Sequence, residues 1–273
     1  FAESEVAALA WTMRTGKSKH CIDRACHMFL NEPEDGGGCV DGVLIIAPNG
    51  VHANWIEREW PIHVWDGVPS IRVAWRSSAM GAKGGNGKGK AAREEWAAES
   101  EFFWNDLRLS KTTRKLVVFA CNSESITRKD VRKAVANFLK TRKRVMLIVD
   151  ESDDFGAPGS QRTKMVRALA RRPNVSPRLI LSGTMLTGSP LAAFSQFEIL
   201  EKGALGFETF EEFKGHFAEY EQGRAMGGRS YPKLTGFKNL DELRERMARF
   251  TSLVLRDECD DIPYFNFERM DIE

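Results

Sequence analysis

The chain has 273 residues, and its composition is that of a globular protein with a core rather than of a disordered chain, with 42% hydrophobic and 29% charged residues. Its formal net charge of +2 excludes binding to an acidic polymer through a global positive field, so such binding would have to come from local clusters. No apolar run approaches the roughly 20 residues of a membrane span, and no secretory signal opens the chain, so we expect a cytoplasmic protein.

Short apolar runs rich in β-branched residues recur along the chain and predict the strands of one sheet. They cover residues 43–47, 71–75, 116–120, 145–150 and 178–182. Continuous apolar runs of this length are typical of strands buried on both faces, as in a parallel sheet. An amphipathic pattern over 128–144 predicts a helix whose basic face is solvated. Alternating strands and helices predict an α/β fold with a central, mostly parallel sheet flanked by helices.

Two other stretches depart from this alternation. Glycine and lysine dominate residues 81–95, which lack apolar periodicity and predict a flexible insertion over 80–96. After residue 200, capping signals at Thr209 and Asn239 predict a helical part over 207–250. Its apolar stripe would be formed by Phe213, Phe217 and Tyr220. The acidic end around Pro263 is typical of a boundary, so we predict one lobe over residues 1–263.

The sharpest local signal is TMRTGKSKH, which follows the apolar run VAALAW. It contains the GK[ST] ending of a phosphate loop, in which backbone N–H groups cradle phosphate, the lysine reaches the β and γ phosphates and the hydroxyl binds Mg²⁺. Because Trp11 stands where the full pattern has its first glycine, the bare motif is also compatible with a chance match. The candidate nucleotide-binding residues are Arg14, Thr15, Gly16, Lys17, Ser18 and Lys19, with Lys17 also catalytic.

An acidic pair follows the apolar run in VMLIVDESDDF. That run would deliver Asp150 and Glu151 to the carboxyl edge of the sheet, where ligands bind in open parallel α/β folds. There Asp150 can hold Mg²⁺ together with Ser18, and Glu151 can orient and deprotonate the attacking water. The alternative is a pair of ordinary loop acids. The upstream GKS favours the catalytic interpretation.

The third element is RLILSGTMLTGSP, an apolar run that ends in small residues. Ser182, Gly183 and Thr184 would let a loop sit against the acidic pair and change its hydrogen bonds when the γ-phosphate is lost. By itself this pattern fits any junction between a strand and a turn. Its value lies in its order after the other two motifs.

In this order, MRTGKSK, LIIAPNGVHANW, VVFACNSES, VDESDDF and SGTMLTGSPLAAFSQFEIL resemble motifs I, Ia, Ib/Ic, II and III of superfamily-two helicases. The chain is most similar to the Swi/Snf-like branch of duplex-DNA translocases, especially phage and bacterial members. FETFEEFKGHF, NLDELRERMARF and RDECDDIP resemble the end of the first, RecA-like lobe in that branch. The second motif departs from DEAH or DEAD because Asp153 replaces the coupling histidine, and no glutamine-bearing adenine motif is visible.

The resemblance implies an ATP- and Mg²⁺-dependent hydrolase that moves along double-stranded DNA without sequence preference, in a bacterium or a phage-infected host. Nucleic acid would meet the loops after 43–47 and 116–120, with Pro48, Asn49, Asn122 and Ser123 as candidate contacts. We expect residues 264–273 to start a linker to a second lobe that the sequence lacks, which predicts weak hydrolysis. Alternatives are an RNA or single-stranded-DNA helicase lobe, a catalytically silent nucleotide- or DNA-binding adaptor, and, less favoured by the motif order, a P-loop kinase.

Overall fold

The computed structural model describes residues 4–31, 39–75, 105, 114–183, 189–224 and 230–259. The predicted insertion over 80–96 and the predicted linker over 264–273 lie outside these residues. In the described part, seven parallel strands form one sheet in the order β3-β4-β2-β5-β6-β1-β9. The strands are β1 (Val6–Trp11), β2 (Gly42–Ala47), β3 (Ser70–Ala74), β4 (Leu116–Asn122), β5 (Val145–Val149), β6 (Val175–Leu181) and β9 (Thr251–Val254).

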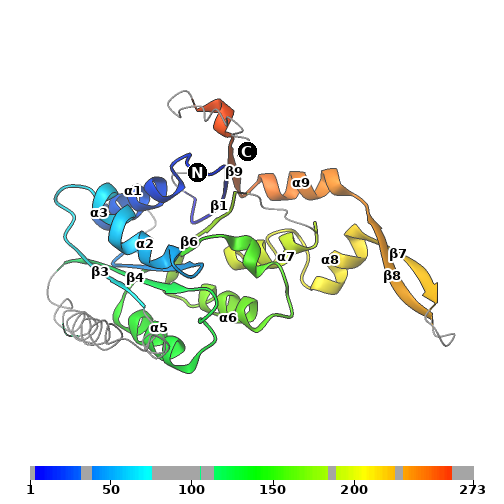
Figure 1. Ribbon diagram of the computed structural model, residues 1–273, viewed down its shortest axis with the longest axis horizontal. Coiled ribbons are helices and arrows are strands. Elements are labelled where there is room, and N and C mark those ends of the chain that lie inside the picture. Colours follow the sequence, from blue (N-terminus) through cyan, green and yellow to red (C-terminus); the bar gives the residue numbers. More distant parts are fainter. Residues whose placement is uncertain are drawn as a thin grey trace, which may run out of the picture.

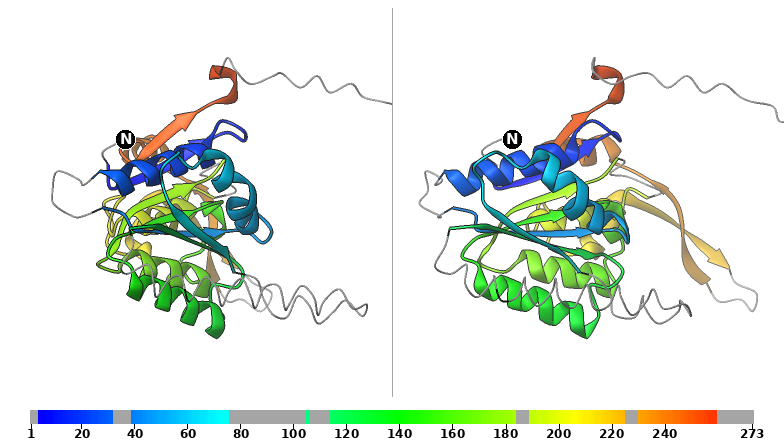
Figure 2. Two further views of the ribbon diagram at one scale, coloured as in Figure 1. Left: turned by 90° about the vertical axis from the view of Figure 1, so that its left-hand side faces the viewer. Right: turned by 60° about the vertical axis from the view of Figure 1, so that its left-hand side comes forward.

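Helices cover both faces of this sheet, as Figures 1 and 2 show. One face carries α1 (Lys17–Leu30) and a helical segment made of α2 (Val51–Asn54), a π-helical turn (Trp55–Glu59) and α3 (Trp60–His63). The other carries α5 (Lys129–Thr141), α6 (Gln161–Ala170), α7 (Ala192–Leu200), α8 (Phe210–Phe217) and α9 (Leu240–Ala248). The predicted α/β architecture is therefore confirmed.

Alternation along the strands explains the two-layered core. In β2, Leu44 and Ile46 pack into the cluster on the α5 side, whereas Val43 and Ile45 pack into the cluster on the α1 side. All four side chains are fully buried because helices lie on both faces. This is the reason that the strands are continuous apolar runs rather than alternating ones.

The predicted helical part over 207–250 is only partly helical. A capping box between Thr209 and Glu212 starts α8 as predicted, but α8 ends at Phe217. An antiparallel hairpin of β7 (Ala218–Arg224) and β8 (Ser230–Phe237) follows and projects from the body of the molecule (Figure 1). Tyr220 is therefore a strand residue, 38% exposed, and its assignment to the apolar stripe was wrong. Asn239 precedes α9 without a side-chain capping bond, since its Nδ2 donates to the His216 carbonyl.

Candidate active site

The segment between β1 and α1 forms a loop over 12–16 at the carboxyl edge of the sheet. Gly16 takes a left-handed conformation, with φ of +91°, immediately before α1 begins at Lys17. Thr15 Oγ1 donates to the Thr12 carbonyl at 2.8 Å and closes the loop. In α1 no side chain caps the N-terminus and the first turn holds no acidic residue. The helix therefore presents its positive end, without a competing carboxylate from its own first turn, to an anion such as phosphate.

Lys17 is the cation of this loop. Its Nζ donates to the Trp11 carbonyl at 2.7 Å, which holds the side chain folded over the loop. Burial raises the pKa of both acidic residues that follow β5, Asp150 and Glu151, and the charge of Lys17 opposes that rise. The loop over 12–16 and the acidic pair lie at the same edge of the sheet, although more than a hundred residues separate them in the sequence. A neutral carbonyl binds an ammonium more weakly than a phosphate does, so Lys17 can exchange one for the other.

Asp150 follows β5 directly and is held on both carboxylate oxygens. Its Oδ2 accepts the indole N–H of Trp55 at 2.8 Å, and its Oδ1 accepts the backbone N–H of Glu151 at 3.1 Å. Burial raises the pKa of Asp150 above its ordinary value, and the Trp55 hydrogen bond opposes that rise. A carboxylate whose two oxygens each accept a hydrogen bond is held in a fixed orientation, which suits a ligand for a divalent cation.

Glu151 occupies a strained backbone position next to Asp150, with φ of +48°. Strain of this kind clusters at functional sites. Burial raises the pKa of Glu151, and the charge of Asp150 raises it further, while Lys17 acts in the opposite direction. A carboxylate with a raised pKa accepts a proton more readily, as a general base must.

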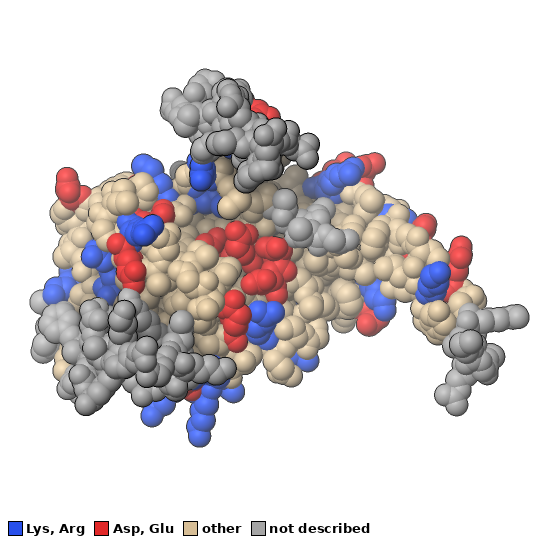
Figure 3. Space-filling view, viewed as in Figure 1, with Lys and Arg blue, Asp and Glu red and all other residues tan. Residues whose placement is uncertain are grey.

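Acidic side chains gather near the middle of the face shown in Figure 3. The segment after β5 contains four acidic residues, Asp150, Glu151, Asp153 and Asp154. The charges of Asp150, Asp153 and Asp154 each raise the pKa of Glu151. Nucleotide phosphates would be repelled by this cluster unless a divalent cation lay between them. The Asp150 carboxylate and the Ser18 hydroxyl are of the ligand types that Mg²⁺ takes, because Mg²⁺ uses few protein ligands and would complete its shell with phosphate and water.

The segment after β6 contacts the acidic loop through one of the three residues suggested for coupling. Ser182, buried to 1% exposure, donates from Oγ to Asp153 Oδ1 at 3.4 Å. Asp153 is therefore linked to the segment that follows β6. Gly183 follows Ser182, and Thr184 lies outside the described residues. Sequence reasoning missed a second contact, in which Ser152 Oγ donates to Gln196 Oε1 of α7 at 2.8 Å in the buried core.

The residues suggested for nucleic acid lie at the same edge, after β2 and β4, but not all are accessible. Asn49 is exposed, and its Oδ1 accepts from Asn122 Nδ2 at 3.4 Å, while Pro48 starts the turn into α2. Ser123 is fully buried, and its Oγ donates to Asp154 at 3.3 Å. The expectation that the Ser123 side chain contacts nucleic acid was therefore wrong. It ties the β4 loop to the acidic loop instead.

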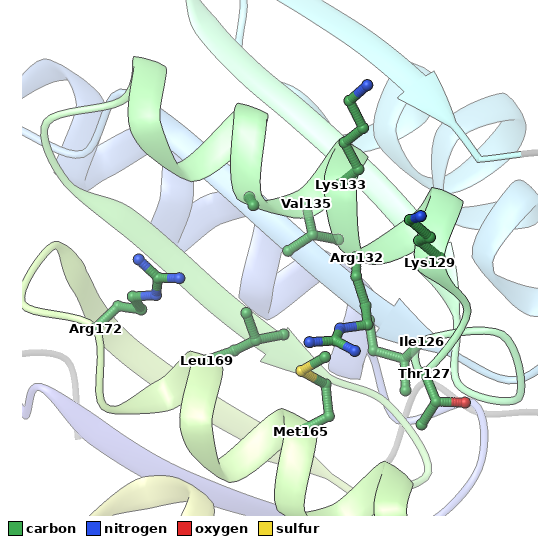
Figure 4. A pocket seen from close by; sticks show the side chains of 10 residues that line it. Ile126, Thr127, Lys129, Arg132, Lys133, Val135, Met165, Leu169 and Arg172 are labelled. Carbon is green, nitrogen blue, oxygen red and sulfur yellow. The ribbon is translucent and has the colours of Figure 1, made fainter.

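A cavity of about 540 Å³ lies elsewhere, between α5 and α6. Its basic lining residues are Lys129, Arg132, Lys133 and Arg172, around an apolar floor that includes Met165 and Leu169 (Figure 4). None of the nucleotide-site residues lines it, so it is separate from the phosphate loop. The basic pattern over 128–144 is only partly the solvated face that was predicted, because Arg142 and Arg144 are buried beyond the end of α5.

Comparisons with known proteins agree with this architecture. No family model matches the chain, and no curated protein matches it. Among solved structures, the chain is similar to the SWI2/SNF2 ATPase core of Sulfolobus solfataricus in complex with dsDNA, with a TM-score of 0.51 and 16% sequence identity. The match covers 93% of this chain and 41% of that one, so this chain spans about two fifths of the archaeal core. At this identity the similarity shows the fold.

Within the described residues, no helix combines the length and the apolar character that crossing a membrane requires.

Proposed function

We propose that this chain is the ATP-binding lobe of a DNA-dependent ATPase that moves along double-stranded DNA. The observation that carries the proposal is that the parallel sheet places the loop ending at Lys17, after β1, and the pair Asp150 and Glu151, after β5, at the same carboxyl edge. In this proposal the helix N-terminus and Lys17 bind phosphates, Ser18 and Asp150 hold Mg²⁺, and Glu151 takes a proton from the attacking water. The magnesium ion supplies charge neutralisation between the phosphates and the acidic cluster.

The proposed track is DNA, because the fold resembles a core that was solved with dsDNA and because the exposed polar loops lie beside the nucleotide site. Asn49 and Asn122 supply polar side chains and Pro48 shapes the turn beside them, and this surface is not a base-reading helix. Contacts of this kind meet the sugar-phosphate backbone and carry no sequence information. We therefore propose binding without a recognition sequence. Cofactors ATP and Mg²⁺, a second lobe that completes the motor, and a cytoplasmic location belong to the same proposal.

Replacing Lys17 with alanine tests the nucleotide site. The Lys17→Ala protein should bind Mg²⁺ with ADP about 10- to 100-fold more weakly, because a charge-assisted hydrogen bond to phosphate is lost. Isothermal titration calorimetry measures this. The matched control is Lys19→Ala, since the Lys19 side chain is turned to Asp23 and contributes only its backbone N–H. Equal ADP affinities of wild type and Lys17→Ala would refute the site.

Replacing Asn49 with alanine tests the DNA surface. We expect duplex affinity to fall about three- to tenfold, the value of one or two neutral hydrogen bonds, and to fall equally for unrelated sequences. The slope of log affinity against log salt should stay constant, because an amide releases no counterion. Fluorescence anisotropy at several salt concentrations measures both. Asn31→Ala, at the far end of α1, is the control, and an equal loss in both variants would remove Asn49 from the interface.

A further inference from the structure

One buried side chain connects the acidic pair to a helix on the α1 side of the sheet. Trp55 is 1% exposed, and its indole N–H donates to Asp150 Oδ2 at 2.8 Å across 95 residues of sequence. The other oxygen, Oδ1, accepts the N–H of Glu151. Trp55 is therefore the side-chain donor that determines how the Asp150 carboxylate is rotated.

The backbone around Trp55 explains how the indole reaches that oxygen. Trp55 opens a π-helical turn between α2 and α3, so the segment from Val51 to His63 is helical throughout but widened in its middle. Such widened turns shift the direction of the side chains that follow and are frequent at functional sites. The indole packs in the cluster with Ile45 and Ala47 of β2. Its position is thus fixed by packing on one side and by Asp150 on the other.

The start of the same helical segment is the exposed turn of residues 48–50. The Pro48 carbonyl accepts the backbone N–H groups of Val51 and His52, which anchors the turn to α2. Asn49, in this turn, is the residue proposed to contact DNA. Asn49 lies six positions before Trp55, and α2 fills the interval between the turn and Trp55, so we expect a displacement of the turn to reach the indole.

We propose that Trp55 is a positioning residue, which holds Asp150 in its metal-binding orientation and couples that carboxylate to the exposed turn of residues 48–50. This inference rests on the proposed ATPase function and adds a residue and a route of communication to it. Partners of metal ligands that lie one step away from the metal typically change metal affinity 10- to 100-fold when they are removed. Removing the indole N–H leaves Asp150 Oδ2 without this donor in a buried site.

The test compares Trp55→Phe with Trp60→Phe. Trp60 lies in the same helical segment and is fully buried, but its indole N–H has no hydrogen-bond partner in the part of the chain that the structure describes. Both substitutions remove the same atoms from the same packed layer. Only the first removes a donor from Asp150. Urea unfolding of both variants shows whether their losses of stability are comparable.

The readout is calorimetric ADP binding in EDTA and over a series of Mg²⁺ concentrations. Trp55→Phe should leave ADP affinity in EDTA unchanged. It should raise the Mg²⁺ concentration that gives half of the Mg²⁺ effect on ADP affinity about 10- to 100-fold. Trp60→Phe should match wild type in both measurements. Equal Mg²⁺ dependence in the two variants would overturn the role of Trp55. If the wild type binds ADP neither in EDTA nor with Mg²⁺, the proposed function itself is overturned.

The coupling to the exposed turn has its own measurement, which needs no stable Trp55 variant. In ¹H–¹⁵N spectra of the wild type, the Trp55 indole signal is identified as the one that Asp150→Asn shifts most. It should move when duplex DNA is added, whereas the Trp60 indole signal should stay in place. A Trp55 signal that is unchanged at saturating DNA would overturn the coupling.

Discussion

ATP hydrolysis by Glu151→Gln should fall about 100- to 10,000-fold, the range that a positioned general base contributes. The amide keeps the shape of the side chain but cannot accept the proton of the attacking water, so affinity for ATP should remain nearly unchanged. Single-turnover assays with protein in excess over labelled ATP measure slow rates directly. Asp154→Asn is the control, because it removes one charge from the same acidic cluster without removing the base. If Glu151→Gln hydrolyses ATP at the wild-type rate, Glu151 is not the general base.

The same residue predicts a pH dependence. Burial and the neighbouring Asp150 raise the pKa of Glu151 above its ordinary value of 4.5. Because the active form is the ionised carboxylate, turnover should decline as pH falls through this raised pKa and should recover as pH increases. The decline should therefore start at a higher pH than a solvent-exposed glutamate would give, and in the residual activity of Glu151→Gln only the part due to Asp150, whose pKa burial also raises, should remain.

Residues 1–273, assayed as a polypeptide by themselves, should hydrolyse ATP about 10³ to 10⁵ times more slowly than a complete motor, with little stimulation by duplex DNA. The family that the motifs resemble supplies its arginine finger from a second lobe, and the archaeal structure extends well beyond the part that this chain matches. An arginine finger stabilises charge that develops only in the transition state, so a polypeptide assayed without a second lobe that supplies one should hydrolyse ATP slowly and still bind nucleotide.

Steady-state turnover with and without duplex DNA measures this expectation. Lys17→Ala, prepared in the same way, sets the background from contaminating ATPases. Strong DNA-stimulated turnover by residues 1–273 would show that an arginine within this chain completes the site. It would then contradict the proposed division of labour between two lobes.

The central strands β2, β4 and β5 could be predicted because they are buried on both faces, which makes them unbroken apolar runs. β9 was missed because it lies at the sheet edge, has only four residues, TSLV, and leaves Leu253 exposed. The hairpin was missed because Tyr220 continues the helical spacing of Phe213 and Phe217. Local periodicity extends a pattern past the point where the backbone changes, here at Ala218.

The candidate site divides in a similar way. Lys17 and Asp150 were identified because phosphate and magnesium chemistry demands particular residue types after particular strands. Trp55 carries no such signal, since a tryptophan in an apolar context is usually only a core residue. Its bond to Asp150 depends on a π-helical turn and on the pairing of β2 with β5. Likewise, nothing local distinguishes half-buried Asn122 from buried Ser123, whose hydroxyl bonds to Asp154 in a distant loop.

The place of β1 in the sheet has a consequence for synthesis on the ribosome. β1 pairs only with β6 and β9, whose residues emerge long after its own. At about 5–20 residues per second, the wait for β6 is on the order of ten to thirty seconds. During that time the apolar run VAALAW and the attached phosphate loop have no sheet to join, while β2, β3, β4 and β5 can already pair. The nascent chain therefore exposes an apolar segment until late in translation. We expect chaperones that bind exposed apolar segments to bind it during that time.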